Sequence, residues 1–226
     1  AHFSFLNNEL LKRGWEQKAS FLIKDEPPFI EAIFRLIKND PDAVLFSFGG
    51  IGSTPDDYTR VCAANVFTDG KMEVNEIALN SILEQFGDDA YPHRIHMADL
   101  PLQAGQLKNV VNNVPGFSLE EKYFFTPGFP SMSQSMVVEA LDTFFPKNQE
   151  KFRYSLKADC SENDLIDIMK LIPEDIDFSS LPQIKNDKRS VVISVASFKK
   201  DEAQKYFSLF ENQLNERSID FVLEDK

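Results

Sequence analysis

The sequence is poor in the residues that build disulfide frameworks and zinc sites. It has only two cysteines, three histidines and one tryptophan among 226 residues. Cys62 and Cys160 lie far apart, and neither belongs to a C-x-x-C or Cys/His spacing. Both kinds of site are therefore excluded as the basis of this fold. We expect the two cysteines to be buried structural residues, as unpaired cysteines usually are.

Long apolar runs and an excess of basic residues are also absent. No apolar stretch approaches the roughly 20 residues that a membrane span needs, and residues 1–5 do not start a secretory signal. The 36 Asp and Glu outnumber the 24 Lys and Arg, and a net charge of −12 repels polyanions. We expect a cytoplasmic protein that binds a small molecule and neither nucleic acid nor a membrane.

The first 146 residues alternate between helical and extended patterns. Apolar spacing predicts helices at about 7–13, 28–37, 58–67, 74–86 and 132–144. It predicts strands at 16–23, 43–48 and 122–126, and residues 100–117 look irregular. This alternation indicates β-α-β units and hence an α/β fold with a three-layer, mainly parallel sheet. The apolar run 43–48 is typical of an inner strand of such a sheet.

The composition turns polar near residue 147, and the rhythm of the elements changes there. Beyond it the pattern predicts strands at 152–158, 191–196 and 219–223, with helices at 162–171 and 201–216. We therefore expect two domains, a larger one at 1–146 and a small α+β domain at 147–226.

The segment with the densest chemical signal lies between a predicted strand and a predicted helix, and reads GGIGSTPDDYT from Gly49 to Thr59. Glycines allow a ligand to approach the backbone, and a helix N-terminus presents free N–H groups to an anion such as phosphate. Hydroxyl groups can donate to phosphate oxygens, and paired carboxylates can hold a divalent cation. The candidates for these three roles are Gly49, Gly50 and Gly52; Ser53, Thr54 and Thr59; and Asp56 and Asp57.

A simpler interpretation of the same loop stays open. Asp56 or Asp57 can cap the helix, and the glycines can make a tight turn. The loop follows neither the Walker pattern nor the G-x-G-x-x-G pattern. The residues alone therefore leave ligand binding and a structural turn equally open.

The loop resembles the G-G-[IL]-G-x-T-x-D-D-x-T signature of MoaB/Mog (molybdopterin-binding) domains of the CinA type. Other segments resemble family motifs in the same order, so the resemblance runs from about residue 2 to about residue 145. These segments are Ile23-Lys24-Asp25, then 96–101, Asn109, 114–117, and 125–130 with Met136. The resemblance implies an α/β ligand-binding domain that forms homo-oligomers.

Two features depart from the family pattern. The family's first strand and its G-D-E-[LI]-L-x-G segment have no counterpart in the printed sequence, and residues 109–113 lack the usual glycine. The part after residue 147 is similar to the small KH-like or ferredoxin-like domain that follows the core in CinA-type proteins.

The resemblance also implies a function. The CinA branch contains metal-dependent pyrophosphatases that act on nucleotides such as ADP-ribose or FAD, and the Asp-Asp-x-Thr form resembles that branch. It implies that Asp57 and Asp25 are catalytic and that Asp56 and Asp57 hold Mg²⁺ or a similar cation. Pro127 and Gly128 would join the loop in binding phosphate. Two alternatives remain: a domain that binds molybdopterin in molybdenum cofactor biosynthesis, and a non-enzymatic binding module.

Overall fold

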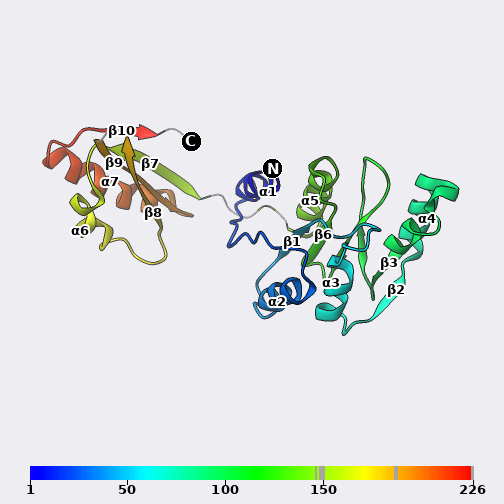
Figure 1. Ribbon diagram of the computed structural model, residues 1–226. Coiled ribbons are helices and arrows are strands. Elements are labelled where there is room, and N and C mark those ends of the chain that lie inside the picture. The colour runs from blue at the N-terminus through cyan, green and yellow to red at the C-terminus, as the bar shows by residue number, and fades with distance from the viewer. Residues whose placement is uncertain (146, 148–150, 186–187, 225–226) are drawn as a thin grey trace. The chain divides into compact units, whose positions relative to one another are not determined.

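The computed structural model describes residues 1–145, 147, 151–185 and 188–224, and is shown as a ribbon in Figure 1. The chain divides into two compact units, Ala1–Lys147 and Asn148–Lys226. Each unit has a core of its own, and each is described here by itself. In the part of the chain that the structure describes, no helix combines the length and apolar character needed to cross a bilayer.

The first unit is built on a mixed four-stranded sheet in the order β1-β6-β5-β4. Strand β1 (Leu45–Phe48) pairs in parallel with β6 (Tyr123–Thr126), with Leu45 opposite Tyr123. Strand β5 (Gly116–Leu119) is antiparallel to β6, and β4 (Gly105–Leu107) is antiparallel to β5. A separate antiparallel pair joins β2 (Met72–Val74) to β3 (Asp99–Pro101).

Helices cover both faces of this sheet and give the unit three layers (Figure 1). Helices α1 (His2–Leu11) and α5 (Pro130–Phe144) pack together on one face. Helices α2 (Pro27–Lys38) and α3 (Thr59–Phe67) pack on the other. Helix α4 (Glu76–Phe86) and the short 3-10 helices η1 (Gly87–Ala90) and η2 (Arg94–Ala98) lie beside the β2-β3 pair.

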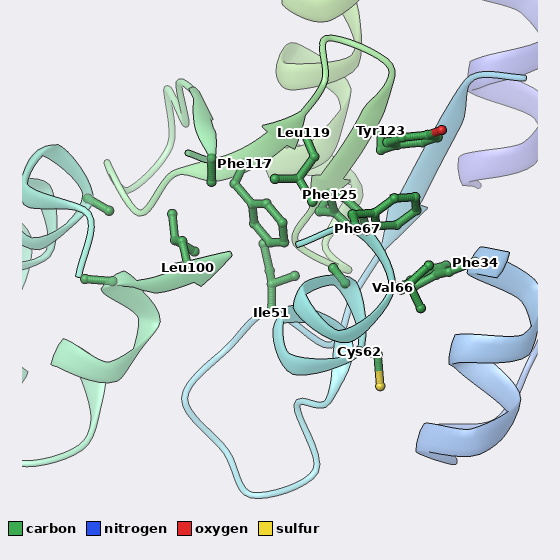
Figure 2. Close-up of a cluster of buried hydrophobic side chains, with 14 of the residues drawn as sticks. Phe34, Ile51, Cys62, Val66, Phe67, Leu100, Phe117, Leu119, Tyr123 and Phe125 are labelled. Atoms are coloured by element: carbon green, nitrogen blue, oxygen red, sulfur yellow. The ribbon is translucent and has the colours of Figure 1, made fainter. Parts of the chain in front are cut away.

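The alternation of side chains along β6 produces this layering. Phe124 points to the α5 side, where it packs with Met136 and Ala140. Tyr123 and Phe125 point to the opposite side, into the aromatic core shown in Figure 2. There the Phe125 ring stacks on Phe117 at 4.5 Å and meets the Phe34 ring edge-on at 5.6 Å. Such aromatic burial is a strong stabilising contribution to a core of this size.

Several sequence predictions for the first unit are wrong in detail. Strand β1 lies at an edge of the sheet, not inside it, and among the described strands of that sheet only its pairing with β6 is parallel. Residues 16–23 form no strand, and Phe21 and Leu22 in them are exposed. Residues 100–117, predicted to be irregular, contain β4 and parts of β3 and β5. The predicted helix 74–86 begins at Glu76, because the Asn75 side chain caps it and residues 72–74 form β2.

The second unit is a smaller α+β domain, which confirms that part of the predicted fold class. Its antiparallel sheet has the order β10-β7-β9-β8. The strands are β7 (Phe152–Ala158), β8 (Asp177–Lys185), β9 (Lys188–Ser197) and β10 (Phe221–Glu224). The helices are η3 (Glu162–Asp164), α6 (Ile166–Met169) and α7 (Lys200–Glu216). The chain order β-α-β-β-α-β is that of a ferredoxin-like domain.

Two predicted features of this unit differ from the structure. The helix predicted at 162–171 is divided into η3 and the single-turn α6, and strand β8 was not predicted. Strand β8 pairs with β9 along its whole length, but most of its side chains are exposed or half-buried. It therefore lacks the apolar alternation by which a strand is recognised.

Candidate ligand-binding site

Two loops meet at one edge of the first sheet because β1 and β6 run in parallel. The loop after β1 starts at Gly49, whose N–H donates to the carbonyl of Thr126 at 2.8 Å. The loop after β6 contains Pro127 and Gly128, and a Cβ atom added to Gly128 would lie 3.5 Å from the Cα of Gly49. The carboxyl ends of parallel strands are a common place for ligand sites in α/β folds. The structure thus brings together the glycines of both predicted phosphate-binding segments.

The glycines of the first loop are required by its backbone path. Gly49 and Gly50 have φ values of +95° and +68°, in the region that favours glycine. A Cβ atom on Gly50 would collide with the hydroxyl of Thr59, and one on Gly52 would lie 2.6 Å from Oδ2 of Asp57. The N–H of Thr59 also donates to the Gly50 carbonyl at 2.9 Å, and Thr59 is buried. The loop therefore folds back tightly on the start of α3.

Asp57 closes the turn that precedes α3. Its Oδ2 accepts hydrogen bonds from the Thr54 N–H at 2.9 Å and from the Thr54 hydroxyl at 2.6 Å. Its own N–H donates to the Thr54 carbonyl at 3.0 Å. Helix α3 begins at Thr59 with Tyr58 as its N-cap, one residue after the predicted start. Asp57 therefore caps the 54–57 turn and does not cap α3.

Asp56 is the exposed member of the acidic pair. The pKa of its carboxyl group is lowered by the neighbouring Thr54 hydroxyl and by its own backbone N–H, so it is ionised at neutral pH. Among the described residues, no three His, Cys, Asp or Glu side chains gather into a metal-binding cluster. A cation at Asp56 and Asp57 would therefore take its other ligands from water and from the bound molecule, as Mg²⁺ commonly does.

The loop also offers backbone N–H groups as hydrogen-bond donors. In the part of the chain that the structure describes, the N–H groups of residues 50–53 donate to no protein acceptor. The neighbouring N–H groups do have acceptors, since Gly49 binds Thr126 and Thr54 binds Asp57. Consecutive free N–H groups beside a helix N-terminus favour an anion.

Two residues near the loop were not predicted to serve it. The Arg60 guanidinium donates to the carbonyl of Gly52 at 2.8 Å and to that of Asp99 at 3.1 Å. The His2 ring stacks on Phe48 at 4.4 Å, and its Nε2 lies 2.9 Å from the Gly128 carbonyl. Nothing local in the sequence shows that residue 2 folds back on residue 128. Arg60 follows the motif directly, but its partners lie far away in sequence.

Asp25 lies at the same edge but outside the loop's network. It is exposed and precedes α2, whose first residue, Pro27, has its carbonyl 3.8 Å from the Cys62 sulfur on α3. The start of α2 therefore lies beside the first turns of α3. Among the described residues, the Asp25 carboxylate accepts no hydrogen bond and makes no ion pair.

The first unit matches a known family of ligand-binding domains. Residues 2–147 match the family described as a probable molybdopterin binding domain. Since this match covers well over half of the 226 residues, the chain belongs to that family.

Individual relatives agree with this assignment. A CinA-like protein of Leptospira biflexa is 28% identical over 184 residues, which cover 72% of this chain and 44% of the relative. A protein of Metallosphaera sedula is 27% identical over 157 residues, or 67% of this chain and 59% of the relative. The crystal structure of the protein CinA, of unknown function, from Thermoplasma acidophilum is 28% identical. It has a TM-score of 0.55, with 63% of this chain and 85% of that chain covered.

These matches confirm the CinA-type, MoaB/Mog-like character that the motifs indicate. The chain spans about half the length of the curated relatives, from 44% of the Leptospira protein to 59% of the Metallosphaera protein.

Proposed function

We propose that the Gly49–Thr59 loop binds the diphosphate of a nucleotide such as ADP-ribose or FAD, and that the chain hydrolyses this diphosphate with a divalent cation, Mg²⁺ or similar. The observation that carries the proposal is the row of free N–H groups at residues 50–53, in the loop that folds back on the start of α3. Backbone donors at such a position bind phosphate without needing basic side chains. This suits a chain whose net charge is −12.

The two carboxylates explain why the proposal includes a cation. Asp56 and Asp57 flank the free N–H groups, so bound phosphates would meet negative charge at that end of the loop. Carboxylate and hydroxyl oxygens are the ligands that Mg²⁺ prefers, and Asp57 with Asp56 would hold it. When bound, such a cation would offset the phosphate charge and activate water.

The residues of the chain have separate roles in this proposal. The N–H groups of residues 50–53 and the hydroxyl of Ser53 would hold phosphate oxygens, whereas the single hydroxyl proton of Thr54 is already donated to Asp57. Gly128 would allow a ligand to approach Gly49 closely, because neither residue carries a side chain. One water molecule is added across the P–O–P bridge: its oxygen bonds to one phosphorus, the bridging bond to that phosphorus breaks, and two phosphomonoesters leave. Asp25 remains a catalytic candidate by its place at the start of α2.

A second function is favoured by the family itself. The family description names molybdopterin, whose phosphate could occupy the same loop. In that case the chain would bind the pterin in molybdenum cofactor biosynthesis, and no diphosphate would be cleaved.

The deciding experiment measures AMP release from ADP-ribose and from FAD with Mg²⁺, and again after chelation of the metal. We predict that Asp57→Asn lowers the turnover by orders of magnitude while thermal stability barely changes, because Asn retains an oxygen acceptor for Thr54 but loses the charge. The control is Asp88→Asn, an exposed aspartate on η1, which should keep full activity. Unchanged metal-dependent turnover in Asp57→Asn would mean that Asp57 only stabilises the 54–57 turn and has no catalytic role. Absence of AMP release from the parent chain, with tight binding of molybdopterin, would select the second function.

A further inference from the structure

Arg60 makes an unusual set of contacts for the second residue of a helix. Its Nη2 donates to the Gly52 carbonyl at 2.8 Å, and its Nη1 donates to the Asp99 carbonyl at 3.1 Å and to the His96 carbonyl. It therefore joins three backbone carbonyls from two segments that are separated by about 45 residues. One is the glycine loop, and the other is the junction between η2 and β3.

The surroundings of the Arg60 guanidinium show that it interacts with the protein rather than with solvent. Its Nε is buried and has no hydrogen-bond partner in the described chain. Burial lowers the pKa of Arg60, while the carboxylates of Asp99 and Asp57 act in the opposite direction. Moving a charged guanidinium from water into the protein costs free energy. We therefore expect the buried Arg60 to have a role that offsets this cost.

We propose that Arg60 is a positioning residue of the ligand site: it clamps the Gly52 carbonyl to the 96–99 segment and so fixes the direction of the free N–H groups at residues 50–53. This inference rests on the proposed function for its ligand, but the clamp itself exists without one. Both Nη atoms already donate to carbonyls, so Arg60 acts through the loop. A planar fork that reaches several carbonyls is available to arginine and not to lysine.

The chain offers a matched control. Arg13 is also largely buried, and its guanidinium donates to Glu9 at 2.6 Å and to Asp142 at 2.7 Å, tying α1 to α5 on the opposite face of the sheet. Replacing Arg13 by Met should lower the stability of the first unit but leave the loop unchanged. Arg60→Met and Arg60→Lys remove the fork at the loop itself.

The test combines two measurements on the full chain. Backbone order parameters from NMR relaxation should fall at Gly52, Ser53 and Thr54 in both Arg60 variants and stay unchanged in Arg13→Met. The affinity for ADP-ribose with Mg²⁺ should fall roughly 10- to 100-fold, as is typical when a residue that orients ligand-binding groups is lost. Arg60→Lys keeps the positive charge, so a loss in that variant points to the fork rather than to charge alone.

The two measurements keep the inference and the proposed function separable. Unchanged order parameters in Arg60→Met would overturn the clamp, and so would an affinity equal to that of the parent chain. If the loop loosens but the parent chain itself does not bind ADP-ribose, the clamp stands and the proposed function fails. If Arg60→Met does not fold, Arg60→Lys decides by the same criteria.

Discussion

At the scale of single residues, Gly50 shows how a backbone conformation and a side-chain contact combine. Its φ of +68° favours glycine, and the space that a Cβ would occupy is taken by the Thr59 hydroxyl. Gly87 also has a positive φ, +52°, but a Cβ there would meet nothing within 4 Å. Substitutions at these two glycines therefore distinguish the cost of backbone strain from the cost of a steric collision.

We predict that Gly50→Ala destabilises the first unit clearly more than Gly87→Ala does. A strained positive-φ backbone costs a non-glycine residue about 1–3 kcal/mol at either position, and at Gly50 the displacement of Thr59 adds to it. Thermal or denaturant unfolding of both variants provides the measurement. Equal losses of stability would mean that Thr59 moves aside freely, and that Gly50 is needed for its φ angle alone.

At the scale of secondary-structure elements, α2 and α3 pack closely around a thiol. Cys62 on α3 is 1% exposed and faces the Pro27 carbonyl at the start of α2. Burial raises the pKa of the Cys62 thiol to about 11, and the Glu31 carboxylate adds to the effect. The thiolate is therefore disfavoured in the folded protein relative to the unfolded chain, where the pKa is lower.

This difference makes the packing of α2 on α3 sensitive to alkaline pH. The folded pKa lies above the unfolded one, so the contribution to stability is complete below the unfolded pKa. It is lost as pH rises towards about 11. We predict that Cys62→Ala reduces the fall in unfolding free energy between about pH 8.5 and 11 by about 2 kcal/mol, the size of such a shift. Denaturant unfolding at several pH values measures it, and parallel curves for the two proteins would contradict it.

Elements with strong local signals were predictable from the sequence. Helices α2, α5 and α7 and strands β1, β6, β7 and β9 lie close to their predicted ranges, because apolar periodicity encodes them directly. Pairing partners were not predictable, since the position of β1 at the sheet edge depends on residues about 80 positions away. Residues 16–23 carry a strand-like pattern but form no strand, because no described strand pairs with them.

The candidate site also has some residues that the sequence predicts and others that it does not. The loop 49–59 and the segment 127–128 were recognised by their motifs, and the structure places them side by side. Arg60 and His2 were missed because their partners, Gly52 with Asp99 and Gly128, become neighbours only in the folded chain. Contacts made by a side chain with distant backbone carbonyls leave no pattern in the sequence.

At the scale of the whole molecule, the two units differ in what they offer a ligand. The candidate site belongs entirely to the first unit, which contains residues 49–60 and 127–128. The second unit is a ferredoxin-like domain whose sheet is crossed by polar pairs, such as Arg153 with Asp177 at 2.5 Å. Self-association, which the family resemblance implies, stays a prediction for the chain as a whole.

The parallel pairing of β1 with β6 has a consequence for how the site comes into being during folding. Leu45 and Tyr123 are partners across 78 residues, so this pairing closes a long loop and has a high entropic cost. The two ends of the site meet only after that closure, and a ligand that bridges them binds only the closed chain. Bound ligand should therefore raise the free energy of unfolding of the entire first unit, by about 2.7 kcal/mol when the ligand concentration is 100 times the dissociation constant.

Trp15, the one tryptophan, lies in this unit, so its fluorescence should report a melting midpoint that rises with added ADP-ribose and Mg²⁺. A midpoint that stays fixed at saturating ligand would show that the closed strand pair is not what the ligand recognises.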